Sequence, residues 1–349
     1  MLLLSAKWLV SSVAVYVVVL AAVTIPFLQT HLVFGHHPGF FATPTDFTRP
    51  EVFGIAPGKA INLNLGTPPT QLGAWFIASD SYHRTLPFPP VDNTTLDVRA
   101  ALELRPTILF LHGKDGHRAR HFRVLLCSAL TSRLDVNVLA LDYRGFGDST
   151  GTPSLAGVAE DARTAFDWLL WQGAVPRDVL ILGTSLGTNF AALLAASLGA
   201  EGIRPRGMVL LSPFASMRRV MYETKLFGFV PLLWPVAGMP FVTRLIDSFI
   251  AHPFNTVGLV PQLDLPILIA HAEDDPIVSH THADELWDTF LSSTSKPSVA
   301  VQEIPYWGTI STLQRKGEEM VLIKTHQGGH GVGSLEGVQD AIGRMFGLV

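Results

Sequence analysis

Val179-Leu180-Ile181-Leu182-Gly183-Thr184-Ser185-Leu186-Gly187 is the stretch of this chain that decides its fold. Its four leading apolar residues predict a short buried strand, and the Ala- and Leu-rich run from Thr188 to Leu198 predicts a helix. The Gly-x-Ser-x-Gly pentapeptide between them requires a sharp turn that leaves the Ser185 hydroxyl clear of the backbone, facing the helix N-terminus. Small residues two positions on either side of the serine let strand and helix approach closely. The stretch predicts a serine nucleophile, provided that its partners occur elsewhere in the chain.

Apolar strands and helical stretches alternate on both sides of this turn. The expected strands cover residues 61–65, 74–78, 107–112, 137–142, 179–183, 207–212, 266–271 and 320–324, and helices are expected near 117–132, 155–172 and 186–199. Near-continuous apolar strands separated by helices indicate a mostly parallel sheet that is covered on both faces. We therefore expect an α/β fold with an eight-stranded sheet in a domain at 61–349, and a surface loop at 306–316.

The groups that a serine nucleophile needs follow it in the chain. A serine needs a base that takes its proton and a carboxylate that orients the base. In the α/β-hydrolase arrangement they come in the order Ser, then Asp or Glu, then His, each on a loop after a strand. Asp275 follows the expected strand at 266–271, and His330 lies in a glycine-rich loop after 320–324. We therefore predict a triad of Ser185, Asp275 and His330.

Each of these two loops offers other candidates. Glu273 and Asp274 precede Asp275, but Asp275 stands directly before Pro-Ile-Val, where a loop at the strand end turns a carboxylate inward. We expect Glu273 and Asp274 to cap the turn or to face solvent. His326 lies closer to its strand than His330, and we expect it to pack rather than to react.

A serine nucleophile of this kind also needs two backbone N–H groups that hold the oxyanion. Leu186, directly after the serine, supplies the first. His112-Gly113-Lys114 follows the third expected strand, and we expect the Lys114 N–H to be the second donor. The lysine side chain is not required for this role. The chemistry requires no metal and no organic cofactor.

Composition restricts the partners. The chain has 349 residues, only 15% of them charged, and a mean hydropathy of +0.33, which favours a membrane-associated protein. The net charge of −4 and the lack of a basic run argue against nucleic acid as a partner. Cys127 is the only cysteine, which rules out an intramolecular disulfide and zinc sites built on several cysteines. We expect it to pack in the core.

An uncharged apolar run stands near the start of the chain. Residues 8–28 contain no charged side chain and would extend about 31 Å as a helix, close to the hydrocarbon thickness of a bilayer. We expect a transmembrane anchor here, after a short cytosolic tail at 1–7 and before a linker at 29–60. A cleaved signal peptide is the alternative, but the run is longer than the apolar part of a typical one.

The distribution of charge predicts the orientation of this anchor. Lys7 precedes the run, and no Lys or Arg follows it until Arg49. Positive charge favours the cytosolic side, so we expect the remaining domain on the luminal or extracellular side. Asn93-Thr94-Thr95 is a possible glycosylation site in a polar loop, which fits this orientation.

The segment 213–263 is too long for a simple connection between two strands. It contains a bulky apolar stretch at 225–242 that is broken by prolines. One interpretation is a buried excursion inside the core. We favour a cap over the active site that binds acyl chains or enters the bilayer, because apolar surface in a long insertion usually marks a ligand or membrane contact.

Four motifs in this order carry a resemblance to a known family. They are His-Gly-Lys-Asp-Gly from His112, Asp-Tyr-Arg-Gly-Phe-Gly-Asp-Ser from Asp142, Gly-Thr-Ser-Leu-Gly from Gly183, and His-Ala-Glu-Asp-Asp-Pro-Ile-Val from His271. The chain resembles the α/β-hydrolase-domain-containing protein 12 family over about residues 60–349, with the protein 13 group as the neighbouring branch. Lys114 is a departure, since the neighbouring branch has Asn after His-Gly.

The resemblance implies an integral membrane serine hydrolase of the endoplasmic reticulum that acts on monoacylglycerols and lysophospholipids, lysophosphatidylserine in particular. From the residues we predict an ester hydrolase with a lipid acyl ester as substrate and the bilayer as partner. A protein or acyl-CoA thioesterase is the first alternative, and a catalytically silent membrane-tethered interaction protein is the second. Epoxide hydrolases and dehalogenases are disfavoured, because they place Asp where this chain has Ser185. Acyl-chain length, head group and oligomeric state are left open.

Overall fold

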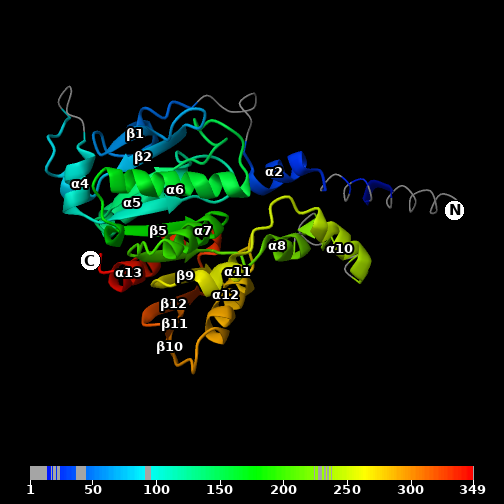
Figure 1. Ribbon diagram of the computed structural model, residues 1–349. Helices are drawn as coiled ribbons and strands as arrows, with labels where there is room; N and C mark the ends of the chain where they lie inside the picture. The colour runs from blue at the N-terminus through cyan, green and yellow to red at the C-terminus, as the bar shows by residue number, and fades with distance from the viewer. Residues whose placement is uncertain are drawn as a thin grey trace.

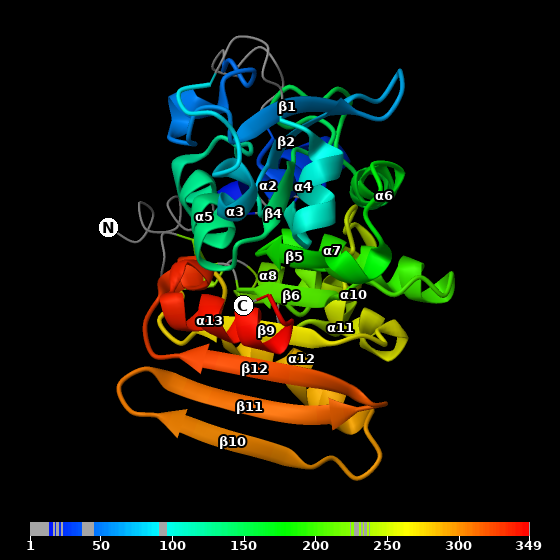
Figure 2. The same cartoon turned by 90° about the vertical axis from the view of Figure 1, so that its left-hand side faces the viewer.

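In the described chain, ten strands form one mixed sheet in the order β1-β2-β4-β3-β5-β6-β9-β12-β11-β10 (Figure 2). The computed structural model describes residues 14–16, 18, 21, 24–36, 45–90, 96–223, 225–226, 230–231, 233, 236 and 238–348. The strands are β1 (Ala60–Leu65), β2 (Leu72–Ile77), β3 (Thr107–Leu111), β4 (Asn137–Leu141), β5 (Val179–Thr184), β6 (Gly207–Leu211), β9 (Ile267–Ala272), β10 (Val299–Ile304), β11 (Gly308–Arg315) and β12 (Glu318–Thr325). The central strands from β4 to β12 are parallel, and antiparallel pairs extend both edges.

Helices cover both faces of this sheet (Figure 1). The main ones are α4 (Val98–Leu104), α5 (His121–Arg133), α6 (Leu155–Trp171), α7 (Gly187–Ala200), α12 (Thr281–Ser292) and α13 (Glu336–Met345). One apolar core joins the sheet to α4, α6, α7 and α12, and a second joins it to α5 and α13. Within β3, Leu109 and Leu111 belong to the first core, whereas Ile108 and Phe110 belong to the second. Both faces are buried, which explains the continuous apolar runs of the central strands.

The expected eight strands are all present, and the sheet has two more. β10 and β11 occupy 299–315, so the prediction of a surface loop at 306–316 was wrong. Lys316 and Gly317 have φ of 52° and 87° and join β11 to β12 by a two-residue hairpin turn, for which φ above zero at both positions is typical. Exposed side chains dominate β10, so it lacks the apolar alternation by which a strand is recognised.

The insertion between β6 and β9 packs partly on itself. Its elements are α8 (Met217–Glu223), a short hairpin of β7 (Lys225–Leu226) and β8 (Val230–Pro231), α10 (Pro240–Ser248), α11 (Thr256–Leu259) and the 3₁₀ turn η3 (Val260–Gln262). Leu233, Val236 and Ile246 form a small apolar cluster of their own. In Figure 1, α8 and α10 project from the body of the molecule on the side where α2 lies.

The first part of the expected linker at 29–60 is docked on the domain. Helix α2 (Pro26–Phe34) ends with Phe34, which is fully buried against the rings of Phe190 and Phe254. The Gln29 side chain donates to the Phe249 carbonyl and accepts from the Ala251 N–H, at 2.6 and 2.7 Å. This part of the segment therefore differs from a free linker, because an aromatic ring and a side-chain amide fix it to the core and to the insertion.

The other N-terminal predictions fall largely outside the described residues. These are the tail at 1–7 and most of the expected span at 8–28, and the sequon at Asn93 also lies outside. Among the residues that are described, helices that combine the length and the apolar character needed to cross a bilayer are absent.

Candidate active site

The predicted nucleophile occupies a tight turn between β5 and α7. Ser185 has φ of 50°, a left-handed conformation that is rare for a residue with a side chain. Its N–H donates to the Leu211 carbonyl at the end of β6 (2.9 Å). A Cβ atom at Gly187 would lie 2.1 Å from the Leu111 carbonyl oxygen, so only glycine allows α7 to start this close to β3. The turn is the strand-to-helix elbow that the pentapeptide predicts.

The predicted base and acid are hydrogen-bonded to each other. His330 Nδ1 lies 2.8 Å from Asp275 Oδ2. His330 belongs to the 3₁₀ segment η4 (Gly329–Ser334), and the Ser212 hydroxyl donates to its backbone carbonyl at 3.2 Å. Ser212 follows Leu211, which accepts from the Ser185 N–H, so the end of β6 holds the histidine loop beside the serine turn. With Nδ1 on the carboxylate, Nε2 is the nitrogen left to exchange a proton with a substrate or nucleophile.

Four donors surround the Asp275 carboxylate. Oδ1 accepts the backbone N–H groups of Ile277 and Val278 at 2.8 and 3.0 Å. Oδ2 lies 3.1 Å from His271 Nε2, in addition to His330. Burial by itself would raise the pKa of Asp275, but the hydrogen bonds from His271 and His330 outweigh it and hold the pKa well below its usual range. The acid is therefore a fixed carboxylate that orients His330.

The other candidates in these loops have different partners. Glu273 and His326 form an exposed contact of 2.8 Å with each other. Asp274 Oδ1 accepts the N–H of Gly329 at 2.7 Å. Asp274 is exposed and holds the loop next to His330 rather than the imidazole itself.

The two predicted oxyanion donors lie in segments that meet at Ser185. A Cβ atom built on Gly113 would lie 3.0 Å from Ser185 Cβ and 3.6 Å from its Oγ, so the loop after β3 passes directly over the serine. Leu186 precedes the first residue of α7, where backbone N–H groups lack helical partners. The N–H groups of Leu186 and Lys114 have no hydrogen-bond acceptor within the described part of the chain.

Sequence reasoning missed two buried side chains of this region. One is His271, on Asp275; the other is Arg123 of α5, whose guanidinium donates to the carbonyls of Gly113 and Lys114 at 3.1 Å. A signal for Arg123 exists, because it precedes the buried residues Cys127 and Leu130 by four and seven positions. A charged residue on the apolar face of a helix is unusual and points to a specific partner.

The predicted core role of Cys127 agrees with its complete burial, which raises the pKa of its thiol to about 12.

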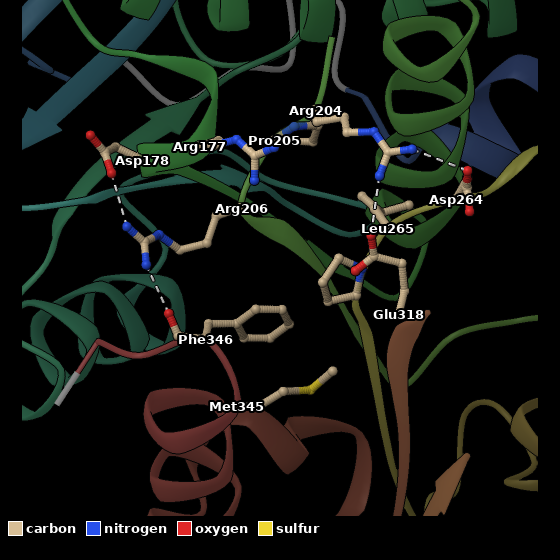
Figure 3. A pocket seen from close by; sticks show the side chains of 11 residues that line it. Arg177, Asp178, Arg204, Pro205, Arg206, Asp264, Leu265, Glu318, Met345 and Phe346 are labelled. Atoms are coloured by element: carbon tan, nitrogen blue, oxygen red, sulfur yellow. Dashed lines mark hydrogen bonds and ion pairs between the residues drawn. The ribbon is translucent and has the colours of Figure 1, made fainter. Parts of the chain in front are cut away.

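A pocket of about 380 Å³ lies at the other end of the sheet (Figure 3). Arg206 precedes β6, and its guanidinium donates to Asp178 and to the Phe346 carbonyl, both at 2.9 Å. Arg204 pairs with Glu318 and Asp264 at 3.1 and 3.4 Å. Asp178, Arg206 and Asp264 precede β5, β6 and β9, and Glu318 is the first residue of β12. Ser185 instead follows β5, so this pocket is separate from the predicted catalytic groups.

Comparison with curated proteins finds relatives among the ABHD12 and ABHD12B proteins. The chain is 36% identical to the lysophosphatidylserine lipase ABHD12 of Danio rerio over 203 residues, 58% of this chain and 51% of that protein. It is 35% identical to the protein of the same name from Rattus norvegicus, over 58% of this chain and 49% of the relative. Protein ABHD12B of Homo sapiens is 34% identical over 52% of this chain and 49% of that protein. The resemblance expected from the four motifs is confirmed, and the chain spans about half the length of these relatives.

Solved structures share the fold. An alpha-beta hydrolase from Vibrio vulnificus superposes with a TM-score of 0.61 at 16% identity, covering 93% of this chain and 91% of that one. An esterase from Pyrococcus furiosus gives a TM-score of 0.53 at 15% identity, covering 89% and 98%. At this identity the likeness concerns the arrangement of the sheet and helices alone.

A model of one protein family matches more than half of the chain, residues 108–328. The matched segment runs from the strand before the Gly113 loop to the loop that carries His330, and it contains Ser185 and Asp275. On this match and on the order of its strands, the chain belongs to the alpha/beta hydrolase family.

Proposed function

We propose that this chain is a serine hydrolase that cleaves acyl esters of single-chain lipids with Ser185, His330 and Asp275. The observation that carries the proposal is the 2.8 Å contact between His330 Nδ1 and Asp275, in a loop that the end of β6 ties to the strained turn at Ser185. Ser185 combines a left-handed backbone with two neighbouring N–H groups that have no acceptor in the described part of the chain. Strain of this kind gathers at functional sites.

The proposed reaction proceeds through an acyl-enzyme. His330 Nε2 takes the Ser185 proton while Oγ attacks the acyl carbonyl carbon. The N–H groups of Leu186 and Lys114 hold the negative oxygen of the tetrahedral intermediate. His330 then protonates the departing alcohol, and the acyl group remains on Ser185. Water, deprotonated by the same imidazole, releases the fatty acid and restores the serine.

We propose a lysophospholipid or a monoacylglycerol as substrate, with lysophosphatidylserine first among them. The name of the vertebrate relatives, lysophosphatidylserine lipase, supports this class of substrate. These substrates carry one acyl ester chain and reside in membranes, which suits a chain with a mean hydropathy of +0.33. Lys114 supplies the second proposed oxyanion donor through its backbone, and its side chain adds a positive charge to this loop, which suits an anionic head group.

We also propose that the domain is anchored in the membrane of the endoplasmic reticulum by residues 8–28 and faces the lumen. The uncharged run supports the anchor, and the placement of Lys7 and Arg49 supports the orientation. The apolar surface of α2 and α10 adds support, since Phe27 and Phe241 are 67% and 79% exposed. Gln29 ties α2 to the segment after α10, so both helices can contact one bilayer.

A fluorophosphonate probe tests the nucleophile. The wild-type chain is expected to be labelled and Ser185→Ala is expected to remain unlabelled. Equal labelling of both would reject Ser185, and labelling of neither would favour a catalytically silent protein. A panel of purified lipids then tests the substrate class: faster cleavage of acyl thioesters than of lysophospholipids and monoacylglycerols would favour a thioesterase.

Two measurements test the membrane proposal. Resistance to extraction by alkaline carbonate is expected for an anchored chain. For a luminal domain, treatment with a glycosidase is expected to change the gel mobility of the protein. The Asn93→Gln variant is expected to lose this change. Extraction by carbonate would contradict the anchor, and a fully unglycosylated protein with the N-terminus accessible to luminal protease would contradict the orientation.

A further inference from the structure

The carbonyl oxygens of the loop after β3 face one buried guanidinium. Arg123 Nη2 donates to the carbonyls of Gly113 and Lys114, both at 3.1 Å, and to that of Asp115. The arginine is only 2% exposed. Among the described residues its Nε and Nη1 have no hydrogen-bond partner and no carboxylate forms a salt bridge with it. Its charge is directed at the backbone of the loop rather than at an acid.

One peptide group joins the Gly113 carbonyl to the Lys114 N–H. In a trans peptide these two bonds point in opposite directions, and this peptide is trans. The Gly113 oxygen faces Arg123 and also accepts from His112 Nδ1 at 2.7 Å. The Lys114 N–H therefore points away from Arg123, on a loop whose Gly113 lies in contact with Ser185.

We propose that Arg123 is a positioning residue of the oxyanion hole: it fixes and polarises the peptide group that presents the Lys114 N–H. A cation on the carbonyl side of a peptide strengthens the N–H on the other side as a donor, as in any chain of hydrogen bonds. The stronger donor stabilises the acyl oxygen most when negative charge develops on it. It therefore stabilises the transition state more than the bound ester. This inference rests on the proposed hydrolase function and adds a residue that acts through the backbone.

Arg315 offers a matched control for substitutions of Arg123. It is also a buried arginine that donates to backbone carbonyls, those of Leu263 and Val260 at 2.7 and 3.3 Å. It ends β11 opposite the first residue of β12, at the far end of the sheet from Ser185. Arg315 Nε also donates to the Ser293 hydroxyl at 3.2 Å. Arg123→Met and Arg315→Met thus each remove a buried cation from a set of backbone carbonyls.

The full chain in detergent is assayed with a soluble short-chain ester and with a trifluoromethyl ketone, whose adduct with serine carries an oxyanion. For Arg123→Met we expect kcat to fall about 10- to 100-fold with KM within about twofold, and the inhibition constant of the ketone to rise by a similar factor. For Arg123→Lys we expect kcat to fall about 3- to 10-fold, because an ammonium group keeps the charge but cannot reach all three carbonyls. Arg315→Met is expected to lower the melting temperature without changing kcat or the inhibition constant.

A folded Arg123→Met whose kcat and inhibition constant match those of Arg315→Met would overturn the proposal. If Arg123→Met does not fold, a folded Arg123→Lys with wild-type kcat and inhibition constant would overturn it in the same way. Failure of the hydrolase proposal is a different result, since it would appear as full activity and full probe labelling of Ser185→Ala.

Discussion

The two ends of the central sheet both carry charged side chains, but the partners of these side chains differ. At the amino ends of the strands, the guanidinium groups of Arg204 and Arg206 are paired with carboxylates and a backbone carbonyl (Figure 3). At the carboxyl ends, Arg118 is paired with Asp142, but the buried Arg123 forms no salt bridge with a described carboxylate, and His330 has Nδ1 bonded to Asp275 and Nε2 left over. At the amino ends the charged groups are neutralised by their partners. At the carboxyl ends hydrogen-bond donors and a base remain available to a ligand.

Parallel topology explains this difference. Each loop that leaves the carboxyl end of a strand runs toward a helix N-terminus, where N–H groups lack partners. The Ser185 turn brings the Leu186 N–H to such a terminus, and the Gly113 loop, well before the start of α5, brings the Lys114 N–H to the same place. The amino ends of the strands receive helix C-termini, which favour basic side chains, and Arg204 and Arg206 there pair with carboxylates and a backbone carbonyl. We call the carboxyl ends of the strands the reactive end of the sheet and the amino ends its inert end.

The largest expected effect at the reactive end is on catalysis. Asp275→Asn should lower kcat about 10⁴-fold, because an amide in place of the carboxylate no longer orients and stabilises the His330 imidazolium. Steady-state ester hydrolysis measures this. Asp274→Asn, one residue away and exposed, is the matched control and should keep kcat within about 10-fold. Loss of activity in the Asp274 variant alone would assign the acid to Asp274.

Helix α7 runs from the reactive end of the sheet to the inert end, so substitutions of its glycines test the comparison. Gly187→Ala at the reactive end places a methyl 2.1 Å from the Leu111 oxygen and should cost about 3 kcal/mol of unfolding free energy. Gly199→Ala at the inert end meets only the Gln262 oxygen at 3.8 Å and should stabilise by about 0.5–1 kcal/mol, through helix propensity. Denaturant unfolding of the two variants measures the difference, and equal stabilities would contradict the close packing at the elbow.

Lowering the pH should reduce the free energy of unfolding by protonating Asp142, which follows β4 at the reactive end. Burial by itself would raise the pKa of Asp142, but Arg118 and His112 outweigh it and lower the pKa to about 2. A carboxyl whose folded-state pKa is depressed stabilises the protein above its unfolded pKa of about 4 and loses this as pH falls toward the folded value. We expect about 2 kcal/mol of stability to disappear between about pH 4 and pH 2.

Unfolding free energies of wild type and Asp142→Asn across this range check the Asp142 prediction. The variant is less stable at neutral pH, because Arg118, which bonds Asp142 at 2.6 Å, loses a buried partner. The gap between the two proteins should narrow as the pH falls. A gap that stays constant from pH 5 to pH 2 would show that Asp142 does not titrate in this window.

The smallest effect is expected at the inert end. Arg204→Ala removes two ion pairs, but the arginine side chain is 52% exposed, so the stability should change by less than about 1 kcal/mol. Ester hydrolysis should not change, because the pocket lies away from Ser185. Thermal unfolding and a kinetic assay of the same preparation measure both quantities. A loss of activity at unchanged stability would show that this pocket communicates with the reactive end.

Much of the fold could be predicted from local patterns. The parallel strands are continuous apolar runs because both of their faces are buried, and the Gly-x-Ser-x-Gly turn follows one of them directly. The edge strand β10 and its neighbour β11 escaped prediction because one face or both are exposed, so their pairing depends on β12 rather than on their own composition. The docking of α2 also escaped prediction, because the burial of Phe34 depends on the rings of Phe190 and Phe254, which are remote in the chain.

The sequence by itself determined the order of the catalytic candidates and the sharp turn at Ser185, since strand, pentapeptide and helix are contiguous in the chain. It also pointed to Asp275 and His330, because in a parallel sheet each such loop must emerge at the same end. Only the tertiary structure decided that His271 joins Asp275, that Arg123 lies under the Gly113 loop, and that Asp274 holds the loop beside His330. The Asp274 contact joins segments that are remote in the chain, and the partner of Arg123 is a backbone carbonyl. The His271 contact is local, but it depends on how the loop after β9 turns back toward the strand. No pattern of residue types encodes these distances.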